Sequence, residues 1–329
     1  MAAAEALEAR TGVEGLIFPE GPRWRRGSLF VSDQYDRKVW KITPRASGEE
    51  GAPAPFAKEE VVAVPNQPSG TGWLADGTML VVSMTDRKLL KLRESPSPSL
   101  EEHADLSSLA TFHCNDMAVD GTGRAYVGNF GFDLFAESLL EKSKFALYVL
   151  LHRLLGQTHA WLLQPANLIC VEPDGRARVA ATDLMFPNGT VVTPDGKTLV
   201  VAETLATRLT AFDIAPNGDL SNRRVWAEVP RGAAPDGICL DEAGGIWVAN
   251  LLAPEVIRVT EGATKGGRGV THRMRTSQPA FACMLGGEDG KTLFACTAPS
   301  HIREKCEEGG SRRGKIEYCT APYARAGWP

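Results

Sequence analysis

Short hydrophobic runs separated by Asp-Gly and Gly-Gly turns recur along the whole chain. Each repeat opens in a similar frame: FPEG at Glu20, QPSG at Ser69, HCND at Asn115, FPNG at Asn188, APDG at Asp236 and FACM at Cys283. Successive positions lie 46–49 residues apart, except for one interval of 73. A period of this length, with several short strands in each repeat, is typical of β-propeller blades. Six repeats therefore predict an all-β, six-bladed β-propeller.

The strands within a repeat predict where its side chains lie. In the second repeat, GTGWL, TMLVVSM and KLLKLR are separated by the turns ADG and TDR. The first strand of a blade is the innermost, so its opening residue should face the central channel, and the second strand returns to the same face. About 14 residues after each opening position stands a polar residue: Asp33, Ser83, Asn129, Glu203, Asn250 and Thr297. We interpret these six as a second functional tier, with turn formation as the alternative.

Four opening residues carry oxygen atoms that suit a hard cation. Glu20, Asn115, Asn188 and Asp236 would converge on the ring axis, and Ca²⁺ takes six to eight oxygen ligands. Without a cation, two carboxylates in a narrow channel would repel each other and be costly to desolvate. We therefore predict one divalent metal ion, calcium in the first place, with Zn²⁺ or Mg²⁺ as alternatives. The competing interpretation is that each residue caps a turn, because Asn and Asp before Gly favour turns.

The long interval comes from an extra segment in the third repeat. Residues 134–165 separate the strand RAYVGN from ANLICV, so they lie between strands two and three and open on the metal face. Leucines at helical spacing predict a helix within residues 136–163, ended by Gly156: Leu147, Leu150, Leu151, Leu154 and Leu155. We expect a lid over the channel, with Tyr148 as a substrate contact. A homodimer contact or a membrane-surface patch are the alternatives.

Composition and the chain ends complete the architecture. The 329 residues are 43% hydrophobic and 23% charged, and the repeats leave no linker, which predicts a single domain over residues 1–329. The last repeat has strands around ACMLG, TLFACT and KIEYC but little beyond. The stretch before Glu20 has room for one strand. We expect that N-terminal strand to complete the sixth blade.

Charge and cysteine usage narrow the class of protein. The net charge of −4 leaves no basic surface to dominate binding of nucleic acid. The N-terminal MAAAEALEAR lacks the apolar core of a secretory signal, and no apolar run is long enough to span a bilayer, so we expect a cytoplasmic protein without a transmembrane segment. None of the seven cysteines forms a CxxC pair. We expect reduced thiols packed in apolar runs.

The opening motifs resemble a known family. EGP at Glu20, CND at Asn115, FPNG at Asn188 and PDG at Asp236 are similar to the metal-binding signatures of the senescence marker protein, gluconolactonase and luciferin-regenerating enzyme family. The similarity covers essentially the whole chain, with diisopropyl fluorophosphatase as a more distant relative. The resemblance implies a lactonase-type hydrolase whose metal is held by Glu20, Asn188 and Asp236, with Asn115 as a ligand or substrate contact. Where sugar-lactone members carry an arginine two residues before that asparagine, this chain has His113.

Ester chemistry fits such a site. A metal polarises a lactone carbonyl and stabilises the oxyanion, while a carboxylate accepts a proton from the attacking water. We assign Asp236 as the base and Glu203 as the reserve candidate, with His113, Asn115, Asn129 and Tyr148 as substrate contacts. The chain has neither a GxSxG elbow nor a GxxxxGK[ST] loop. Phosphotriester hydrolysis of the fluorophosphatase type and ligand binding without catalysis are the alternatives.

Overall fold

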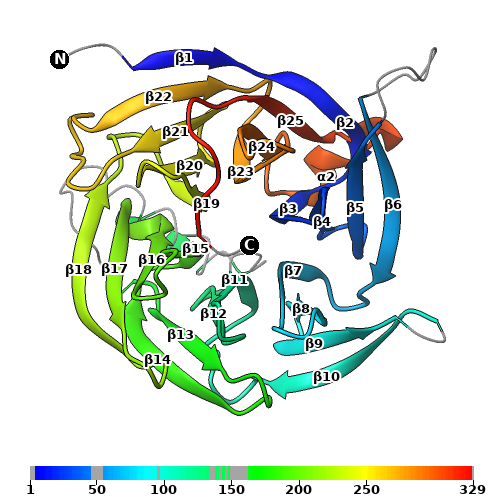
Figure 1. The fold of residues 1–329 in the computed structure, drawn as a ribbon, viewed down its shortest axis with the longest axis vertical. Coiled ribbons are helices and arrows are strands. Elements are labelled where there is room, and N and C mark those ends of the chain that lie inside the picture. Colours follow the sequence, from blue (N-terminus) through cyan, green and yellow to red (C-terminus); the bar gives the residue numbers. More distant parts are fainter. Residues whose placement is uncertain are drawn as a thin grey trace.

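Six β-sheets surround a common axis (Figure 1). The structure, a computed structural model, describes residues 4–45, 55–94, 97–133 and 162–327, together with 138, 140, 143–144 and 147–148. Within these ranges, four strands of each blade pair antiparallel in an up-and-down order, and each blade follows the previous one around the ring. The predicted six-bladed β-propeller is therefore confirmed.

The first three blades run from the innermost to the outermost strand in chain order. Blade one contains β3 (Pro19–Arg25), β4 (Ser28–Asp33), β5 (Lys38–Pro44) and β6 (Phe56–Ala63). Blade two contains β7 (Pro68–Trp73), β8 (Met79–Ser83), β9 (Lys88–Arg93) and β10 (Ser99–Asp105). Blade three contains β11 (Cys114–Val119), β12 (Ala125–Asn129), β13 (Ala166–Val171) and β14 (Ala177–Leu184).

The remaining blades include the strands that close the ring. Blade four contains β15 (Pro187–Val192), β16 (Thr198–Glu203), β17 (Arg208–Ile214) and β18 (Leu220–Glu228). Blade five contains β19 (Pro235–Leu240), β20 (Ile246–Asn250), β21 (Glu255–Val259) and β22 (Val270–Arg275), with β1 (Glu5–Glu8) added at its outer edge. Blade six contains β23 (Ala280–Gly286), β24 (Thr292–Thr297), β25 (Gly314–Thr320) and β2 (Arg10–Leu16).

The N-terminal segment closes the propeller in two places. β2 pairs antiparallel with β25 and supplies the outer strand of blade six, as the sequence predicted. β1 was not predicted: it pairs parallel with β22 of blade five, in a register that sets Leu7 opposite Met274. The same short segment therefore joins the fifth and sixth blades along the rim, as the blue strands in Figure 1 show.

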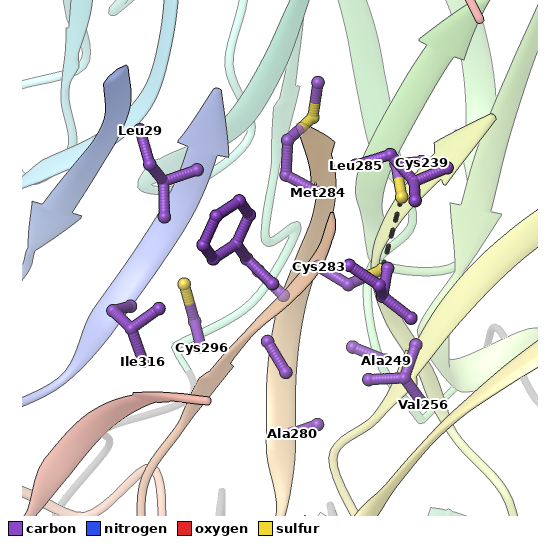
Figure 2. Close-up of a cluster of buried hydrophobic side chains, with 14 of the residues drawn as sticks. Leu29, Cys239, Ala249, Val256, Ala280, Cys283, Met284, Leu285, Cys296 and Ile316 are labelled. Carbon is purple, nitrogen blue, oxygen red and sulfur yellow. Dashed lines mark hydrogen bonds between the residues drawn. The ribbon is translucent and has the colours of Figure 1, made fainter. Parts of the chain in front are cut away.

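The hydrophobic core lies between adjacent blades. Innermost strands such as β11 and β15 are buried along their whole length, whereas the outer strands alternate between buried and exposed residues. Strands buried on both faces favour continuous apolar runs, and the second strands, such as MLVVS in β8 and IWVAN in β20, carried the clearest hydrophobic signal. Figure 2 shows part of this core, where Cys239 of blade five and Cys283 of blade six lie side by side.

All seven cysteines are buried free thiols, which confirms the prediction of reduced cysteines. The closest approach that we find among the described thiols is between the Sγ atoms of Cys239 and Cys283, at 3.8 Å (Figure 2). Burial, followed by the neighbouring Cys239 thiol, raises the pKa of Cys283 well above its usual value. This thiol is therefore a packing group rather than a nucleophile.

Most of the predicted helical insertion lies outside the described residues. Its described residues at 140, 143–144 and 147–148 have helical backbone, but the helix predicted over residues 136–163 is not confirmed. The segment connects β12 to β13, the second and third strands of blade three. Its roles as a lid, a dimer contact or a membrane-surface patch stay predictions. In the described part of the chain, no helix is long and apolar enough to cross a membrane.

The C-terminal segment packs on the propeller at the axis. After β25 the chain turns inward, and its last described residues lie near the centre of the view in Figure 1. Ala326 N–H donates to the Leu240 carbonyl and Ala324 N–H to the Glu242 carboxylate, both at 3.0 Å. Leu240 ends β19, so this contact is at the end of the inner strand that lies away from Pro235 and Asp236.

Candidate active site at the propeller axis

Every innermost strand opens with the same local irregularity. A residue at its start pairs with the last residue of the second strand, as Pro19 pairs with Asp33 and Pro187 with Glu203. One extra residue then interrupts the pairing in all six blades. Such a β-bulge bends a strand and re-aims the side chains beside it. The residues at these bulges, here called the opening residues, are Glu20, Ser69, Asn115, Asn188, Asp236 and Phe281.

Blade six departs from the predicted register. Strand pairing makes Phe281, not Cys283, the equivalent of Asp236. The Cys283 thiol points instead into the layer between blades, where it donates to the Trp247 carbonyl at 3.4 Å. Phe281 packs edge-on against Phe18, with 4.7 Å between ring centroids. The prediction was wrong because interval length alone does not reveal a two-residue slip.

The glycines of the motifs are required by the neighbouring blade. A Cβ atom on Gly189 would lie 2.3 Å from the backbone nitrogen of Ile238, and one on Gly237 would lie 2.5 Å from the Cα of Ala282. Real Cβ contacts are not that short, so only glycine permits the inner strands to approach this closely. The Asn-Gly and Asp-Gly pairs therefore belong to strands packed around the axis, and the alternative that they cap turns is wrong.

A chain of hydrogen bonds runs from a side chain of blade two, through blades three and four, to the backbone of blade five. Ser69 Oγ donates to Asn115 Oδ1 at 3.3 Å, and Asn115 Nδ2 donates to Asn188 Oδ1 at 3.0 Å. Asn188 Nδ2 donates to Thr204 Oγ1 at 3.3 Å, and Thr204 Oγ1 donates to the Pro235 carbonyl at 2.8 Å. This arc fixes both amide groups, and it sets an oxygen lone pair of Asn188 beside Asn115.

Glu20 and Asp236 are buried carboxylates that interact with each other. Burial, followed by repulsion from Asp236 and Asp116, raises the pKa of Glu20 well above its usual value. Burial, followed by repulsion from Asp116, likewise raises the pKa of Asp236, and a hydrogen bond from Asn188 offsets only part of this rise. The Oδ1 atom of Asp236 is buried without a hydrogen-bond partner among the described residues.

These features fit a bound cation. A buried carboxylate oxygen without a partner is costly, and a positive charge removes that cost together with the repulsion between the two acids. In the described part of the chain, no group of three or more His, Cys, Asp or Glu side chains is arranged to hold a metal ion. A metal at this position would therefore need amide oxygens from Asn115 and Asn188 in addition to the two carboxylates.

A buried ion pair beside the opening residues was not predicted. Asp116 follows Asn115 on β11, and its Oδ1 accepts a hydrogen bond from Arg23 Nη2 on β3 at 3.1 Å. Arg23 Nη2 also donates to the Met117 carbonyl. Both side chains are about 5% exposed. The available signal was a charged residue inside each otherwise buried inner strand, EGPRW and CNDMAV.

All six second-tier residues are buried, and four of them anchor the backbone that leads into the inner strand of their own blade. Asp33 accepts hydrogen bonds from the N–H groups of Ile17 and Phe18 at 2.8 and 2.9 Å. Asn250 does the same for Ala234 N–H at 3.1 Å. Asn129, predicted as a substrate contact, accepts from Thr111 N–H and Oγ1 and donates to the Asn167 carbonyl at 2.7 Å. These contacts hold the backbone just before the opening residues, and the role of Asn129 as a substrate contact stays a prediction.

Glu203 is fully buried and its oxygens are occupied. Oε2 accepts from Met185 N–H at 2.8 Å, Oε1 accepts from Arg208 Nε at 2.9 Å and from Thr210 Oγ1, and Arg223 Nη2 lies 3.3 Å from both. Burial alone would raise the pKa of Glu203, but Arg208 and the hydrogen bonds outweigh it, so this pKa is lowered. This contact set is that of a side chain that anchors the backbone before Asn188, and the role of Glu203 as reserve base stays a prediction.

His113 is half-buried beside the opening face. Its ring lies 4.1 Å from that of Phe112, and burial lowers its pKa, so the imidazole is neutral at pH 7. Its Nδ1 atom is buried without a hydrogen-bond partner among the described residues. This leaves one ring nitrogen of His113 for a ligand. Tyr148, in contrast, is buried and donates its hydroxyl to the Leu205 carbonyl at 2.7 Å.

Two aromatic clusters flank the opening residues. One, from blades two to four and the insertion, includes Phe130, Phe132, Tyr148 and Phe186. The other, from blades five, six and one, includes Phe18, Tyr35 and Phe281. Phe186 has a positive φ of 59°, which is unusual for a bulky residue. Its ring packs edge-on against that of Phe130, with 4.9 Å between ring centroids.

Comparison with known proteins gives a consistent result. The family model described as SMP-30/Gluconolactonase/LRE-like region matches residues 18–299. Human regucalcin is 27% identical over 222 residues, which cover 65% of this chain and 66% of regucalcin. The 6-deoxy-6-sulfogluconolactonase of Pseudomonas putida is 29% identical over 131 residues, covering 39% of this chain and 43% of that protein. The matched part spans 60–66% of the length of the rabbit and human regucalcins.

A solved structure confirms the fold independently. The calcium-binding protein regucalcin from Agrobacterium tumefaciens superposes with a TM-score of 0.72 at 19% identity, covering 99% of this chain and 98% of that one. At this identity the superposition bears on the fold alone. It extends over the full ring of six blades.

Proposed function

Because this chain belongs to the SMP-30/gluconolactonase/LRE-like family, we propose that it is a metal-dependent hydrolase that opens a lactone. The observation that carries the proposal is the pair of buried carboxylates at the axis, one of which keeps an oxygen without a partner among the described residues. Family membership supports a hydrolase of the lactonase type. The metal, the individual roles of the residues and the choice of substrate are our inference.

The proposed metal ligands are Glu20, Asn188 and Asp236, with Asn115 as the fourth. All four are buried opening residues, and Asn188 is hydrogen-bonded to both Asn115 and Asp236. When bound, a divalent ion would polarise the lactone carbonyl and stabilise the developing oxyanion. Ca²⁺ is favoured because the set consists of carboxylate and amide oxygens.

Asp236 is the proposed proton acceptor for the attacking water. Its Oδ1 atom has no hydrogen-bond partner among the described residues and would accept that proton, while the carboxylate would also help to hold the ion. Glu203 is not assigned to this step, because its two oxygens already accept several hydrogen bonds. His113 is the proposed substrate contact, through the buried Nδ1 described above.

An apolar or aromatic lactone is the proposed substrate class. Phe281 takes the opening position between the two carboxylate-bearing blades, with Phe18 against it. An aromatic wall at this position favours apolar substrate groups, each buried methylene contributing about 0.8 kcal/mol. Hydrated sugar lactones would gain less from such a wall.

A lactone series of increasing side-chain length tests this proposal. Hydrolysis should improve with apolar length in the wild-type protein, and Phe281→Ala should weaken this dependence by raising KM for the longest substrates most. Val225→Ala, which truncates an exposed side chain on outer strand β18, is the matched control and should leave the series unchanged. Hydrolysis of phosphotriesters but of no lactone would show that the electrophile is phosphorus rather than carbon.

A further inference from the structure

We propose that Arg23 sets the ion selectivity of the axial site by cancelling the charge of Asp116, so that the bound ion faces a net charge of −2. The inference rests on the metal site of the proposed function and adds a residue that does not itself touch the ion. Arg23 is therefore a positioning residue, acting through Asp116 and the strands that carry the ligands.

The first support is the geometry of the contact. Arg23 Nη2 donates to Asp116 Oδ1 at 3.1 Å and to the Met117 carbonyl, while Arg23 Nη1 donates to the Pro22 carbonyl at 2.8 Å. Asp116 Oδ1 also accepts its neighbouring Met117 N–H at 2.8 Å. The guanidinium is thus held by backbone and side chain together, and about 5% of either charged side chain is exposed.

The second support is the path that the side chain takes. Arg23 is on β3 of blade one and Asp116 is on β11 of blade three, so the pair reaches past the inner strand of blade two. That strand carries glycine at positions 70 and 72, and a Cβ on Gly70 would lie 2.3 Å from the Met117 nitrogen. The opening residue of blade two, Ser69, carries no charge. The Arg23–Asp116 ion pair therefore joins β3, which carries Glu20, to β11, which carries Asn115, across blade two.

The third support is the count of buried charges. Three carboxylates, those of Glu20, Asp116 and Asp236, are buried on the inner strands β3, β11 and β19, where charges interact through a low-dielectric interior. Arg23 is the cation that acts on Glu20. Three negative charges and one positive charge leave two negative charges, which a divalent ion balances. Without Arg23 the same site would present three, which suits a trivalent ion better.

The test compares the affinities of Ca²⁺ and Tb³⁺ in purified protein by calorimetric titration. We expect Arg23→Met to raise the ratio of Tb³⁺ to Ca²⁺ affinity by about tenfold or more. Asp116→Asn should lower the ratio, because it leaves a net charge of −1. The double variant Arg23→Met/Asp116→Asn restores the count of two, and its ratio should return to within about threefold of the wild-type value.

Arg258→Met is the matched control. Arg258 and Asp241 form another buried ion pair, with Nε and Oδ2 2.6 Å apart, on β21 and just beyond the end of β19 that lies away from Asp236. Loss of that pair should destabilise the fold comparably without changing the ion ratio. Thermal unfolding without metal shows whether each variant is folded. If Arg23→Met does not fold, Asp116→Asn still tests the direction in which the ratio of Tb³⁺ to Ca²⁺ affinity changes.

The outcomes separate this inference from the proposed function. Suppose that the wild-type protein binds Ca²⁺ and that the folded Arg23 and Asp116 variants keep its ratio of Tb³⁺ to Ca²⁺ affinity. The ion pair would then be purely structural, and this inference alone would be overturned. Wild-type protein that binds neither ion would overturn the metal site itself, and this inference with it. Opposite shifts in the two single variants that cancel in the double variant support it.

Discussion

At the scale of single residues, the site depends on carboxyl groups that are held in a buried environment, where their ionised form is unfavourable. Glu20 and Asp236 are both buried, and each has a pKa raised by burial first and by a neighbouring carboxylate second. Such strain persists in a fold when a ligand relieves it. The amides of Asn115 and Asn188 are fixed by their hydrogen bonds, so little side-chain entropy would be lost on binding an ion.

Replacing Asp236 by Asn separates its proposed roles. The amide keeps an oxygen ligand of similar shape but removes the proton acceptor, so kcat should fall by about two orders of magnitude or more while some Ca²⁺ binding remains. Steady-state kinetics with calcium titration of the same sample measure both effects. Unchanged kcat in protein that still binds calcium would transfer the proton acceptor to another residue.

The raised pKa values predict how stability depends on pH. Without metal, the folded protein retains protons on Glu20 and Asp236 that the unfolded chain loses near pH 4. The free energy of unfolding should therefore fall as pH rises from about 4 to the raised pKa values. With saturating Ca²⁺ both groups stay ionised in the folded state, so this fall in the free energy of unfolding should be absent above about pH 4. Melting temperatures across that pH range, with chelator and with calcium, measure the difference.

At the scale of elements, each opening residue lies at a bulge, and four of the six are supported by a second-tier anchor. Asp33, Asn129, Glu203 and Asn250 bind backbone amides two to four residues before the opening residue of their own blade. The strands and their period could be predicted because the second strand of each blade is a short, mostly apolar run, such as MLVVS in β8 and IWVAN in β20. The anchors were assigned to the site because a polar residue at a strand end does not reveal whether it faces the axis or its own backbone.

Glu203→Gln tests the role of an anchor. The substitution removes a buried charge that accepts from Arg208 Nε and lies within reach of Arg223, and it should lower the free energy of unfolding by roughly 2 kcal/mol. The kcat of the folded fraction should stay within about threefold of the wild-type value. Denaturant unfolding and kinetics at a temperature where the variant is folded measure the two quantities. A loss of turnover as large as that of Asp236→Asn would return Glu203 to the chemistry.

Tertiary contacts explain the remaining differences between sequence and structure. Phe281 was missed because a two-residue slip in blade six hardly changes the interval between repeats. The ion pair between Arg23 and Asp116 was missed because the two residues are 93 positions apart in the sequence, and no local pattern pairs them. The glycines were recognised by position, but their cause is the backbone of the next blade rather than a turn.

At the scale of the whole molecule, the ring holds together residues that are far apart in the chain. β2 and β1 join the start of the chain to blades six and five, and residues after β25 pack at the axis on the end of β19 away from Asp236. Closure was predictable because the sixth repeat lacked an outer strand. The parallel pairing of β1 was not, since a four-residue strand with mostly exposed side chains has almost no hydrophobic pattern.

In the proposed site, four of the six blades supply the oxygen ligands of one divalent ion that hydrolysis requires. The most direct measurement of this requirement is lactone hydrolysis by wild-type protein after exhaustive chelation and again after Ca²⁺ is restored, with Glu20→Gln alongside. The account predicts that chelation abolishes activity, that calcium restores it in the wild type, and that Glu20→Gln needs at least about tenfold more calcium for the same recovery. Full activity in protein shown by elemental analysis to be free of divalent metal would contradict it.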